Sequence, residues 1–154
     1  MVTLQPGDLA PNFEGKIQDG SIIRLSDYRG KKLVLFFYPK DNTPGCTAEV
    51  CSLRDGYAQL RGIGFELLGV SPDGEKKHQN FIAKYELPFP LIADEEKVVL
   101  KAYGAWGLKT MYGKLFDGVH RTTFIIDEEG KIMHVIGKVQ TKDHAGQIIE
   151  LMTG

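Results

Sequence analysis

The two cysteines of this 154-residue chain, Cys46 and Cys51, lie five residues apart in the stretch FFYPKDNTPGCTAEVCSLRD (36–55). A cysteine thiolate is a nucleophile and a metal ligand, and a cysteine pair can cycle between dithiol and disulfide. The spacing differs from the C-x-x-C of dithiol reductases. The four histidines show no ligand spacing that would complete a zinc site of about four ligands. Two interpretations remain: a reactive thiol pair, or two buried structural cysteines.

Cys46 is predicted to lie in the first turn of a helix. Thr43 is a good N-cap residue, Pro44 suits the first helical position, and Gly45 lets a ligand approach the backbone. The unpaired backbone N–H groups and the helix dipole at this end favour a thiolate over a thiol. Cys46 also stands outside the apolar stripe of the helix, which weakens the interpretation as a structural cysteine. We therefore predict that Cys46 is the reactive sulfur.

Cys51 is predicted to face away from Cys46 as long as the helix is intact. Five residues of α-helix correspond to a rise of about 7.5 Å and a rotation of roughly 500°, so the two side chains point to different faces. A disulfide needs Cα atoms about 4.4–6.8 Å apart. The two sulfurs therefore either never bond, or bond only after the first turns unwind. Helix termini open at low cost, so the pattern favours a switch between a helical dithiol and an unwound disulfide.

The elements that must position these cysteines alternate between strands and helices. The apolar run at 33–38 is typical of a strand buried on both faces, and Asp19-Gly20 suits the turn of an N-terminal hairpin. The predicted elements are the hairpin at 12–25, strands at 33–38, 65–70 and 91–92, helices at 44–61, 74–86 and 94–104, an irregular excursion at 105–120, a strand pair at 121–137, and a closing helix at 141–154 capped by Thr141. This order indicates an α/β fold with a mixed central sheet flanked by helices. The loop after Tyr38 leaves the carboxyl end of a central strand, where open α/β sheets place their chemistry.

Length and composition narrow the class of protein. A chain of 154 residues suits one domain, spanning 1–154, and is long enough to bury a core without a disulfide or a metal. The net charge of −1 argues against a general nucleic-acid binder. No apolar run approaches the roughly 18 residues of a membrane span, and the start MVTLQPGDLAPNF lacks the features of a signal peptide. We therefore expect a cytoplasmic protein, in whose reducing compartment a cysteine pair is more often catalytic, redox-sensing or metal-binding than structural.

The cysteine-bearing stretch resembles the active-site segment of the peroxiredoxins. Their pattern P-x-x-x-T-x-x-C is matched by Pro39, Thr43 and Cys46, and the second cysteine five residues later resembles the Q-type subfamily, also called bacterioferritin comigratory protein. The segments YELPFPLIAD, YGAWGLKTMYG and RTTFIID resemble further parts of that subfamily in the same order. The resemblance therefore covers nearly the whole chain.

This resemblance implies a thioredoxin-like fold and a thiol peroxidase that reduces hydrogen peroxide and organic hydroperoxides. Cys46 would be the peroxidatic cysteine, oxidised to a sulfenic acid, and Cys51 the resolving cysteine that forms an intramolecular disulfide. Thioredoxin or a similar dithiol would reduce that disulfide. Thr43 would place its hydroxyl against the thiolate and the peroxide, Arg121 would hold its guanidinium over the site, and Pro39 would shield the sulfur from water. The family implies no metal, haem or flavin, and its Q-type members are often monomeric, which favours a monomer. The charge balance and the lack of a long apolar run favour neither a nucleic-acid nor a membrane partner.

Three other functions are compatible with the same cysteines. A redox sensor or holdase-type chaperone would use the switch to alter a surface, a thiol–disulfide oxidoreductase would share the fold, and a structural domain would carry inert thiols. Of the neighbouring residues, Glu49 should oppose ionisation of the thiol, and orienting Arg121 is one hypothesis for its role. We interpret Arg54 as a helix-surface cation and His120 as structural. Trp106 is interpreted as packing the excursion.

Overall fold

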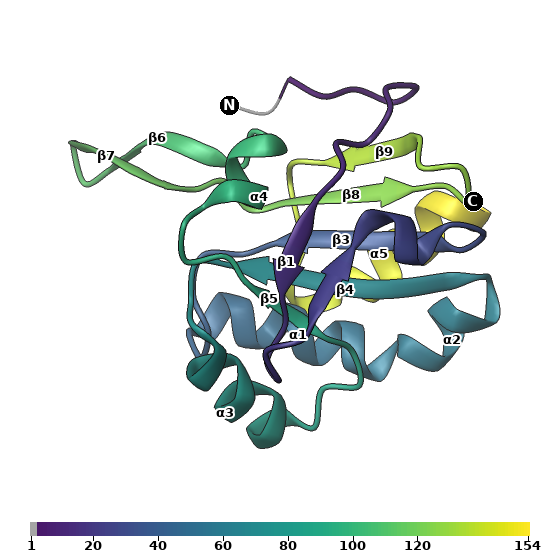
Figure 1. Ribbon diagram of the computed structural model, residues 1–154, viewed down its shortest axis with the longest axis horizontal. Helices are drawn as coiled ribbons and strands as arrows, with labels where there is room; N and C mark the ends of the chain where they lie inside the picture. Colours follow the sequence, from purple (N-terminus) through teal and green to yellow (C-terminus); the bar gives the residue numbers. More distant parts are fainter. Residues whose placement is uncertain (1–2) are drawn as a thin grey trace.

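The structure is a computed structural model and describes residues 3–154. Its centre is a five-stranded sheet with the strand order β5-β4-β3-β8-β9 (Figure 1). The strands are β3 (Lys32–Phe37), β4 (Phe65–Ser71), β5 (Leu91–Ala93), β8 (Thr122–Ile126) and β9 (Ile132–Ile136). β4 runs parallel to β3 and to β5, whereas β8 is antiparallel to β3 and to β9. The predicted α/β fold with a mixed sheet is thus confirmed.

Helices connect the parallel strands, as crossover connections must. Those between β3 and β4 are α1 (Pro44–Asp55) and α2 (Tyr57–Gly62), and the one between β4 and β5 is α3 (Glu75–Tyr85). Two further helices, α4 (Val98–Ala102) and α5 (His144–Thr153), follow later in the chain.

The sheet is buried on both faces because its central strands are apolar on both. Along β3, Val34 and Phe36 pack into a cluster with residues of α1, α3 and α5, while Leu33 and Leu35 pack into a second cluster with residues of α4 and the N-terminal segment. Successive side chains of a strand point to opposite faces, so the continuous apolar run fills both cores. This double burial holds the carboxyl end of β3, from which the cysteine loop leaves, in a fixed position.

The N-terminal hairpin is present as predicted. Its strands β1 (Glu14–Lys16) and β2 (Ile22–Arg24) pair antiparallel, and Gly20 in the connection has a φ of 84°. A short 3₁₀ turn, η1 (Leu25–Tyr28), leads from the hairpin to β3.

The chain at 105–120 is not the irregular excursion that we predicted but a second hairpin. Strands β6 (Trp106–Met111) and β7 (Lys114–Val119) pair antiparallel and project from the body of the molecule (Figure 1). The turn residues Tyr112 and Gly113 have φ values of 53° and 75°, the left-handed pair that tight hairpin turns require. Tyrosine is a rare residue in such a turn, and the hairpin exposes many of its apolar side chains, so neither the turn nor a strand alternation was visible in the sequence.

Three helices also differ from the prediction, and one of them, expected at 94–104, spans only Val98–Ala102. The expected helix at 44–61 divides at Gly56 into α1 and α2, where a Cβ at position 56 would lie 2.5 Å from the Cβ of Ala145. The close approach of α5 therefore requires a glycine at this point. At the other end of the chain, Thr141 begins a 3₁₀ turn, η2 (Thr141–Asp143), and the cap of α5 is Asp143, whose carboxylate accepts from the backbone N–H of Gly146.

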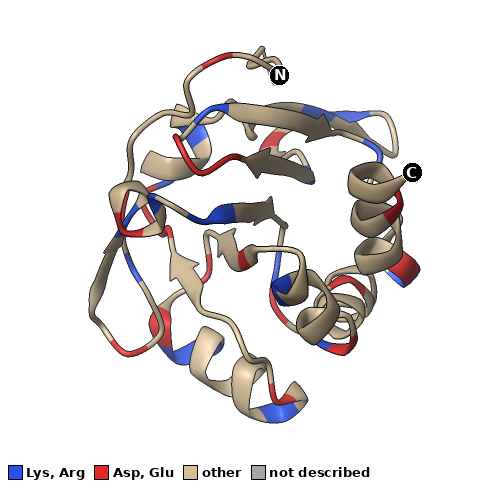
Figure 2. Ribbon diagram, turned by 90° about the vertical axis from the view of Figure 1, so that its right-hand side faces the viewer, with Lys and Arg blue, Asp and Glu red and all other residues tan. Residues whose placement is uncertain are grey.

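None of the helices within residues 3–154 has the length and apolarity that a membrane crossing needs. In the view of Figure 2, basic and acidic segments are interspersed along the ribbon, in keeping with a net charge of −1.

Replacing Gly69 by alanine should destabilise the sheet. Gly69 lies in β4, and an added Cβ would fall 2.6 Å from Leu91 Cδ2 and 2.7 Å from Phe36 Cζ. Overpacking of this kind costs about 1–3 kcal/mol, so urea unfolding should show that loss for Gly69→Ala. The matched control is Gly62→Ala, because a Cβ at Gly62 meets nothing within 4 Å. Equal free energies of unfolding for the two variants would contradict this account of the core.

Candidate active site

Cys46 lies in the first turn of α1, at the end of the loop that follows β3. Thr43 is the cap of the helix through its backbone, since its carbonyl oxygen accepts from the N–H of Thr47 at 2.8 Å, and Pro44 occupies the first turn. The predicted helix start is therefore confirmed. The Cys46 side chain is only 1% exposed, although it stands at a helix terminus.

Arg121 supplies the polar partner of the Cys46 sulfur. Its guanidinium donates through Nη2 to Cys46 Sγ at 3.3 Å and through Nη1 to Glu49 Oε1 at 2.5 Å. A Cβ on Gly45 would lie 3.4 Å from the same Nη2, so the glycine leaves room for the guanidinium. A cation at this distance favours a negative charge on the sulfur. The structure thus brings Arg121 and Cys46 together, as the sequence predicted.

Glu49 holds the other side of the guanidinium. Its side chain is fully buried, and its Oε2 atom has no hydrogen-bond partner among the described residues. Burial raises the pKa of Glu49 to about 7, against the opposing attraction of Arg121. From the sequence alone, Glu49 is expected to oppose ionisation of the thiol. The geometry supports the other hypothesis, because the carboxylate faces the cation that contacts the sulfur.

His144 completes this buried group and was missed at the level of sequence, where we weighed it only as a metal ligand. It is the first residue of α5, and its Nε2 lies 2.7 Å from Thr123 Oγ1 and 3.8 Å from Glu49 Oε2. Its Nδ1 lies 2.9 Å from Gln147 Oε1. The amide nitrogen of Gln147 donates to Lys138 O, so Oε1 is left to accept from Nδ1–H, and Nε2 is left as an acceptor. Burial lowers the pKa of His144 to about 4, and the ring is therefore neutral at pH 7.

A second buried group fixes the loop that leads to Cys46. Tyr38 OH donates to Asp41 Oδ1 at 2.6 Å, and His78 Nδ1 lies 2.6 Å from Asp41 Oδ2. The other ring nitrogen of His78 faces the carbonyl oxygen of Ile92 at 2.9 Å. Both ring nitrogens thus lie within hydrogen-bond distance of an oxygen. Asp73 Oδ2 accepts from the backbone N–H of Asp41. The path of the chain up to Thr43 is therefore set by side chains that follow β3 and β4, namely Tyr38 and Asp73, and by His78 of α3.

The remaining predicted site residues lie on the same loop and helix. The Thr43 hydroxyl donates to Lys40 O at 2.8 Å, which leaves the oxygen lone pairs as acceptors. Pro39 is half-buried at the start of the loop, and its role as a shield stays a prediction. Cys51 is half-buried on α1, and both cysteines are free thiols on one unbroken helix.

Three further residues can now be placed. Arg54 is more than a surface cation, because its Nη1 donates to Tyr85 O at 2.9 Å and so joins α1 to the end of α3. Trp106 is half-buried at the start of the β6–β7 hairpin. His120 binds Ala105 O through its backbone N–H and has no partner for its Nε2 among the described residues.

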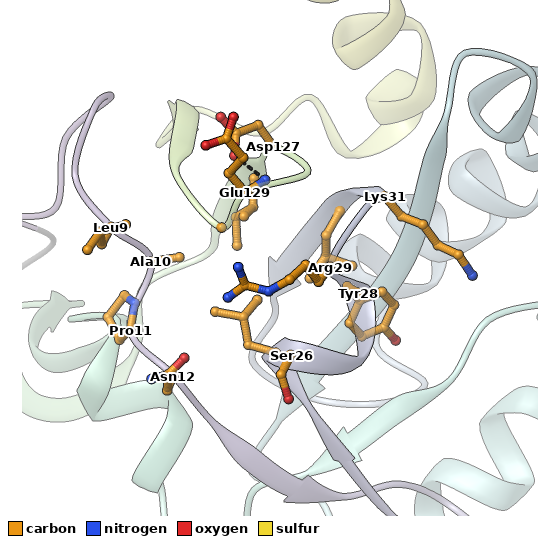
Figure 3. A pocket seen from close by; sticks show the side chains of 14 residues that line it. Leu9, Ala10, Pro11, Asn12, Ser26, Tyr28, Arg29, Lys31, Asp127 and Glu129 are labelled. Carbon is orange, nitrogen blue, oxygen red and sulfur yellow. Dashed lines mark hydrogen bonds between the residues drawn. The ribbon is translucent and has the colours of Figure 1, made fainter.

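A separate cavity of about 380 Å³ lies at the other end of β3 and is lined by no cysteine. It lies between the N-terminal segment and the turn after β8, with Arg29 directed into it (Figure 3). Within residues 3–154, no group of three or more His, Cys, Asp or Glu side chains is placed to hold a metal ion.

The chain is similar in sequence to proteins of a known family. A family model described as AhpC/TSA family matches residues 6–135. The chain is 42% identical over 151 residues to peroxiredoxin Bcp of Bacillus subtilis, covering 98% of this chain and 96% of the relative. It is also 42% identical over 144 residues to peroxiredoxin Bcp of Escherichia coli, covering 94% of this chain and 92% of the relative.

Solved structures show the same likeness. A cysteine-to-serine mutant of PrxQ from Xylella fastidiosa superposes with a TM-score of 0.90 at 33% identity, covering 99% of this chain and 97% of that one. A bacterioferritin comigratory protein of Xanthomonas campestris, described in terms of alkyl peroxide reduction, superposes with a TM-score of 0.87 at 32% identity and covers 99% and 97%. The thioredoxin-like fold expected from the resemblance is thereby confirmed.

Glu49 and His144 should influence stability in opposite directions as pH changes. The folded-state pKa of Glu49 is raised from 4.5 to about 7, so its stabilising contribution is present below pH 4.5 and is lost as pH rises through 7. The pKa of His144 is lowered from 6.5 to about 4, so its contribution is present above pH 6.5 and is lost as pH falls through 4. In the wild type the two contributions to the pH dependence of the unfolding free energy partly cancel.

Single substitutions should reveal how each residue changes the free energy of unfolding with pH. Relative to wild type, the free energy of unfolding of Glu49→Gln should rise more steeply with pH between about 4 and 6.5, where His144 acts alone. That of His144→Gln should fall more steeply between about 4.5 and 7. Urea unfolding across this range measures both, and each variant is the control of the other because the slopes have opposite signs. Parallel curves for all three proteins would refute this coupling.

Proposed function

Because the chain belongs to the AhpC/TSA family, and within it to the peroxiredoxins of the Bcp or Q type, we propose that Cys46 is the peroxidatic cysteine of this hydroperoxide reductase. The observation that carries the proposal is the 3.3 Å contact of Arg121 Nη2 with Cys46 Sγ. Cys46 is buried in an apolar cluster, but a purely structural thiol would need no cation beside its sulfur. This sulfur lies at the positive end of a helix and faces a guanidinium, and both favour the thiolate.

The first step is attack of the Cys46 thiolate on one oxygen of a hydroperoxide. The sulfur donates its electron pair, an S–O bond forms and the O–O bond breaks. Cys46 becomes a sulfenic acid, and the second oxygen leaves as hydroxide or alkoxide, which takes a proton and departs as water or alcohol. Arg121 stabilises the charge that develops on the leaving oxygen, since its donors are already aimed at the site. Thr43 accepts a hydrogen bond from the peroxide, because its own hydrogen is engaged by Lys40 O.

Glu49 acts on this step as a positioning residue. It touches the guanidinium and not the sulfur, and its short contact with Nη1 sets the direction in which Nη2 points. Arginine presents its donors in a rigid fork, so holding one nitrogen orients the other. The cost of burying the Glu49 carboxylate is offset in part by this pairing.

The second step joins Cys46 to Cys51. The Cys51 thiolate attacks the sulfenic sulfur, an S–S bond forms as the S–O bond breaks, and the oxygen leaves as hydroxide, which takes a proton to become water. On intact α1 the two residues are separated by a rise of about 7.5 Å, so the first turns of the helix unwind for the bond to form. A thioredoxin-like dithiol then attacks the disulfide, and exchange returns both cysteines to thiols while the reductant becomes a disulfide.

The roles of the two cysteines are tested by intact mass after one equivalent of hydrogen peroxide. Wild type should lose about two mass units, as the disulfide forms, and Cys51→Ser should gain about sixteen, as the sulfenic acid accumulates. Cys46→Ser should do neither and should have no peroxidase activity. Peroxide turnover retained by Cys46→Ser would overturn the assignment of Cys46. Full thioredoxin-driven turnover by Cys51→Ser would overturn the resolving role. A single stoichiometric oxidation of wild type without turnover would favour a redox sensor.

Arg121→Lys should lower kcat/KM for hydrogen peroxide by about 100-fold, the loss typical of removing one donor that stabilises transition-state charge. Lysine keeps the charge but cannot contact the sulfur and Glu49 at once with a fixed fork. The control is Arg61→Lys, because Arg61 makes a half-exposed ion pair with Glu66 at 3.1 Å, away from the cysteines. Equal losses in the two variants would contradict the role given to Arg121.

A further inference from the structure

The β6–β7 hairpin carries most of the large apolar side chains that the described residues leave open to solvent. Leu108 is 66% exposed, Leu115 is 71% exposed, and Tyr112 in the turn is 95% exposed, while Met111 and Phe116 are exposed as well. The hairpin projects from the body of the molecule, so the central sheet and its helices do not cover these side chains (Figure 1). Clustered apolar exposure of this kind marks a surface that contacts a protein or a membrane.

The apolar side chains lie on both faces of the hairpin. Directly paired residues of two antiparallel strands share a face, and successive residues of one strand alternate between the faces. By the strand register, Leu108 and Leu115 share one face, and Met111 and Phe116 share the other. A protein groove or a second copy of the chain would cover one face and leave the other in water, whereas lipids surround an inserted hairpin on both faces. The distribution of apolar side chains therefore favours a lipid surface.

The tip of the hairpin, residues 108–116, is also cationic. Its sequence LKTMYGKLF holds Lys109 and Lys114 and no acidic residue. The ion pairs of the described residues include neither lysine, and Lys109 Nζ donates only to a neutral acceptor, the carbonyl oxygen of Val119, at 2.8 Å. Lysines beside apolar and aromatic side chains are the combination that binds the interface of anionic membranes.

We propose that the tip of the β6–β7 hairpin inserts into the surface of an anionic lipid bilayer and holds the protein there. The apolar side chains of the tip enter the boundary between head groups and acyl chains, and the two lysines contact lipid phosphates. The sequence favoured no membrane partner because it lacks a long apolar run, but a surface contact needs no spanning segment. The inference does not depend on the peroxide chemistry proposed for Cys46.

The insertion is shallow because a two-stranded hairpin has two open edges. The backbone N–H and C=O groups along these edges would have no partner in hydrocarbon, so they must stay within reach of water or head groups. Tyr112 at the turn therefore reaches deepest, at the interfacial level that aromatic side chains prefer. Trp106, the single tryptophan of the chain, begins β6 at the opposite end of the hairpin and stays outside the bilayer.

The first test is flotation of the full chain with vesicles of phosphatidylglycerol and phosphatidylcholine in equal parts. Wild type should float with the vesicles at low salt, and Leu108→Ser with Leu115→Ser should weaken binding by about tenfold or more, because two leucine side chains are no longer buried in lipid. Met111→Ser, on the opposite face, should weaken binding by at least about fivefold. The matched control is Leu9→Ser with Val98→Ser, since these residues are 69% and 65% exposed but lie outside the hairpin, and it should bind as wild type does.

Charge and depth are tested separately. Binding should fall with vesicles of phosphatidylcholine alone, and also at an ionic strength of about 1 M, where the Debye length shrinks to roughly 3 Å. Lys114→Gln should lower binding by about fivefold, the effect of one lysine near an anionic surface, whereas Lys138→Gln, at an exposed position outside the hairpin, should not. Bromine atoms on the acyl chains should quench the fluorescence of Tyr112→Trp and leave that of wild type, which comes from Trp106, nearly unchanged.

Equal flotation of the wild type and the hairpin variants, or equal binding with and without phosphatidylglycerol, would overturn the proposal. A concentration-dependent dimer that Leu108→Ser with Leu115→Ser dissociates would also overturn it, by assigning the surface to a second copy of the chain. A raised KM for a thioredoxin-type reductant in that variant, without a change in flotation, would assign the surface to the reductant instead. Turnover of hydrogen peroxide in solution should match wild type in every hairpin variant, which shows that the substitutions leave the fold intact.

Discussion

The geometry of the candidate active site depends on one half-buried cation, the guanidinium of Arg121, which contacts a sulfur and a carboxylate at once. Arg121 stands directly before β8, and the register of β8 against β3 pairs Thr122 with Phe37. That pairing brings the arginine to the edge of the sheet from which the cysteine loop leaves. The cation is tolerated in a half-buried place because Glu49 lies on its other side. Sheet register, helix position and side-chain charge thus converge on a single contact.

Much of the fold was predictable because its signals are local. The apolar run at 33–38 and the Asp19-Gly20 turn each carry a pattern that their neighbours alone determine. The start of α1 at Thr43 and Pro44 is likewise a local signal. What was missed depends on contacts between distant segments. The helix divides at Gly56, where Ala145 approaches so closely that a Cβ would lie 2.5 Å away, and the sequence around position 56 does not reveal that approach.

The residues of the candidate active site were also predictable only where a local sequence pattern reveals them. Cys46, Cys51, Thr43 and Arg121 stood out because their types and spacing resemble a known pattern. His144 could not be found in this way, since its partners Thr123 and Gln147 are ordinary hydrogen-bonding residues until α5 packs over the sheet. The contact of Glu49 with Arg121 could be stated only as a hypothesis, because a carboxylate three residues from a cysteine can as well repel the thiolate as orient its partner. Only the folded arrangement distinguishes the two.

The two ends of α1 are held very differently. Its C-terminal half is joined to the rest of the protein by Ala145 N–H donating to Ser52 Oγ at 3.1 Å, by Arg54 binding Tyr85 O, and by the tight fit at Gly56. In the redox cycle proposed above, these contacts favour an unwinding of α1 that starts at the Cys46 end and stops before Ser52. In the proposed cycle, one half of α1 would therefore unwind while the other half keeps its contacts with α3 and α5. Substitutions beyond Ser52 would loosen the attachment of α1 to α3 and α5, whereas substitutions at the partly exposed positions of its first turns would leave that attachment intact.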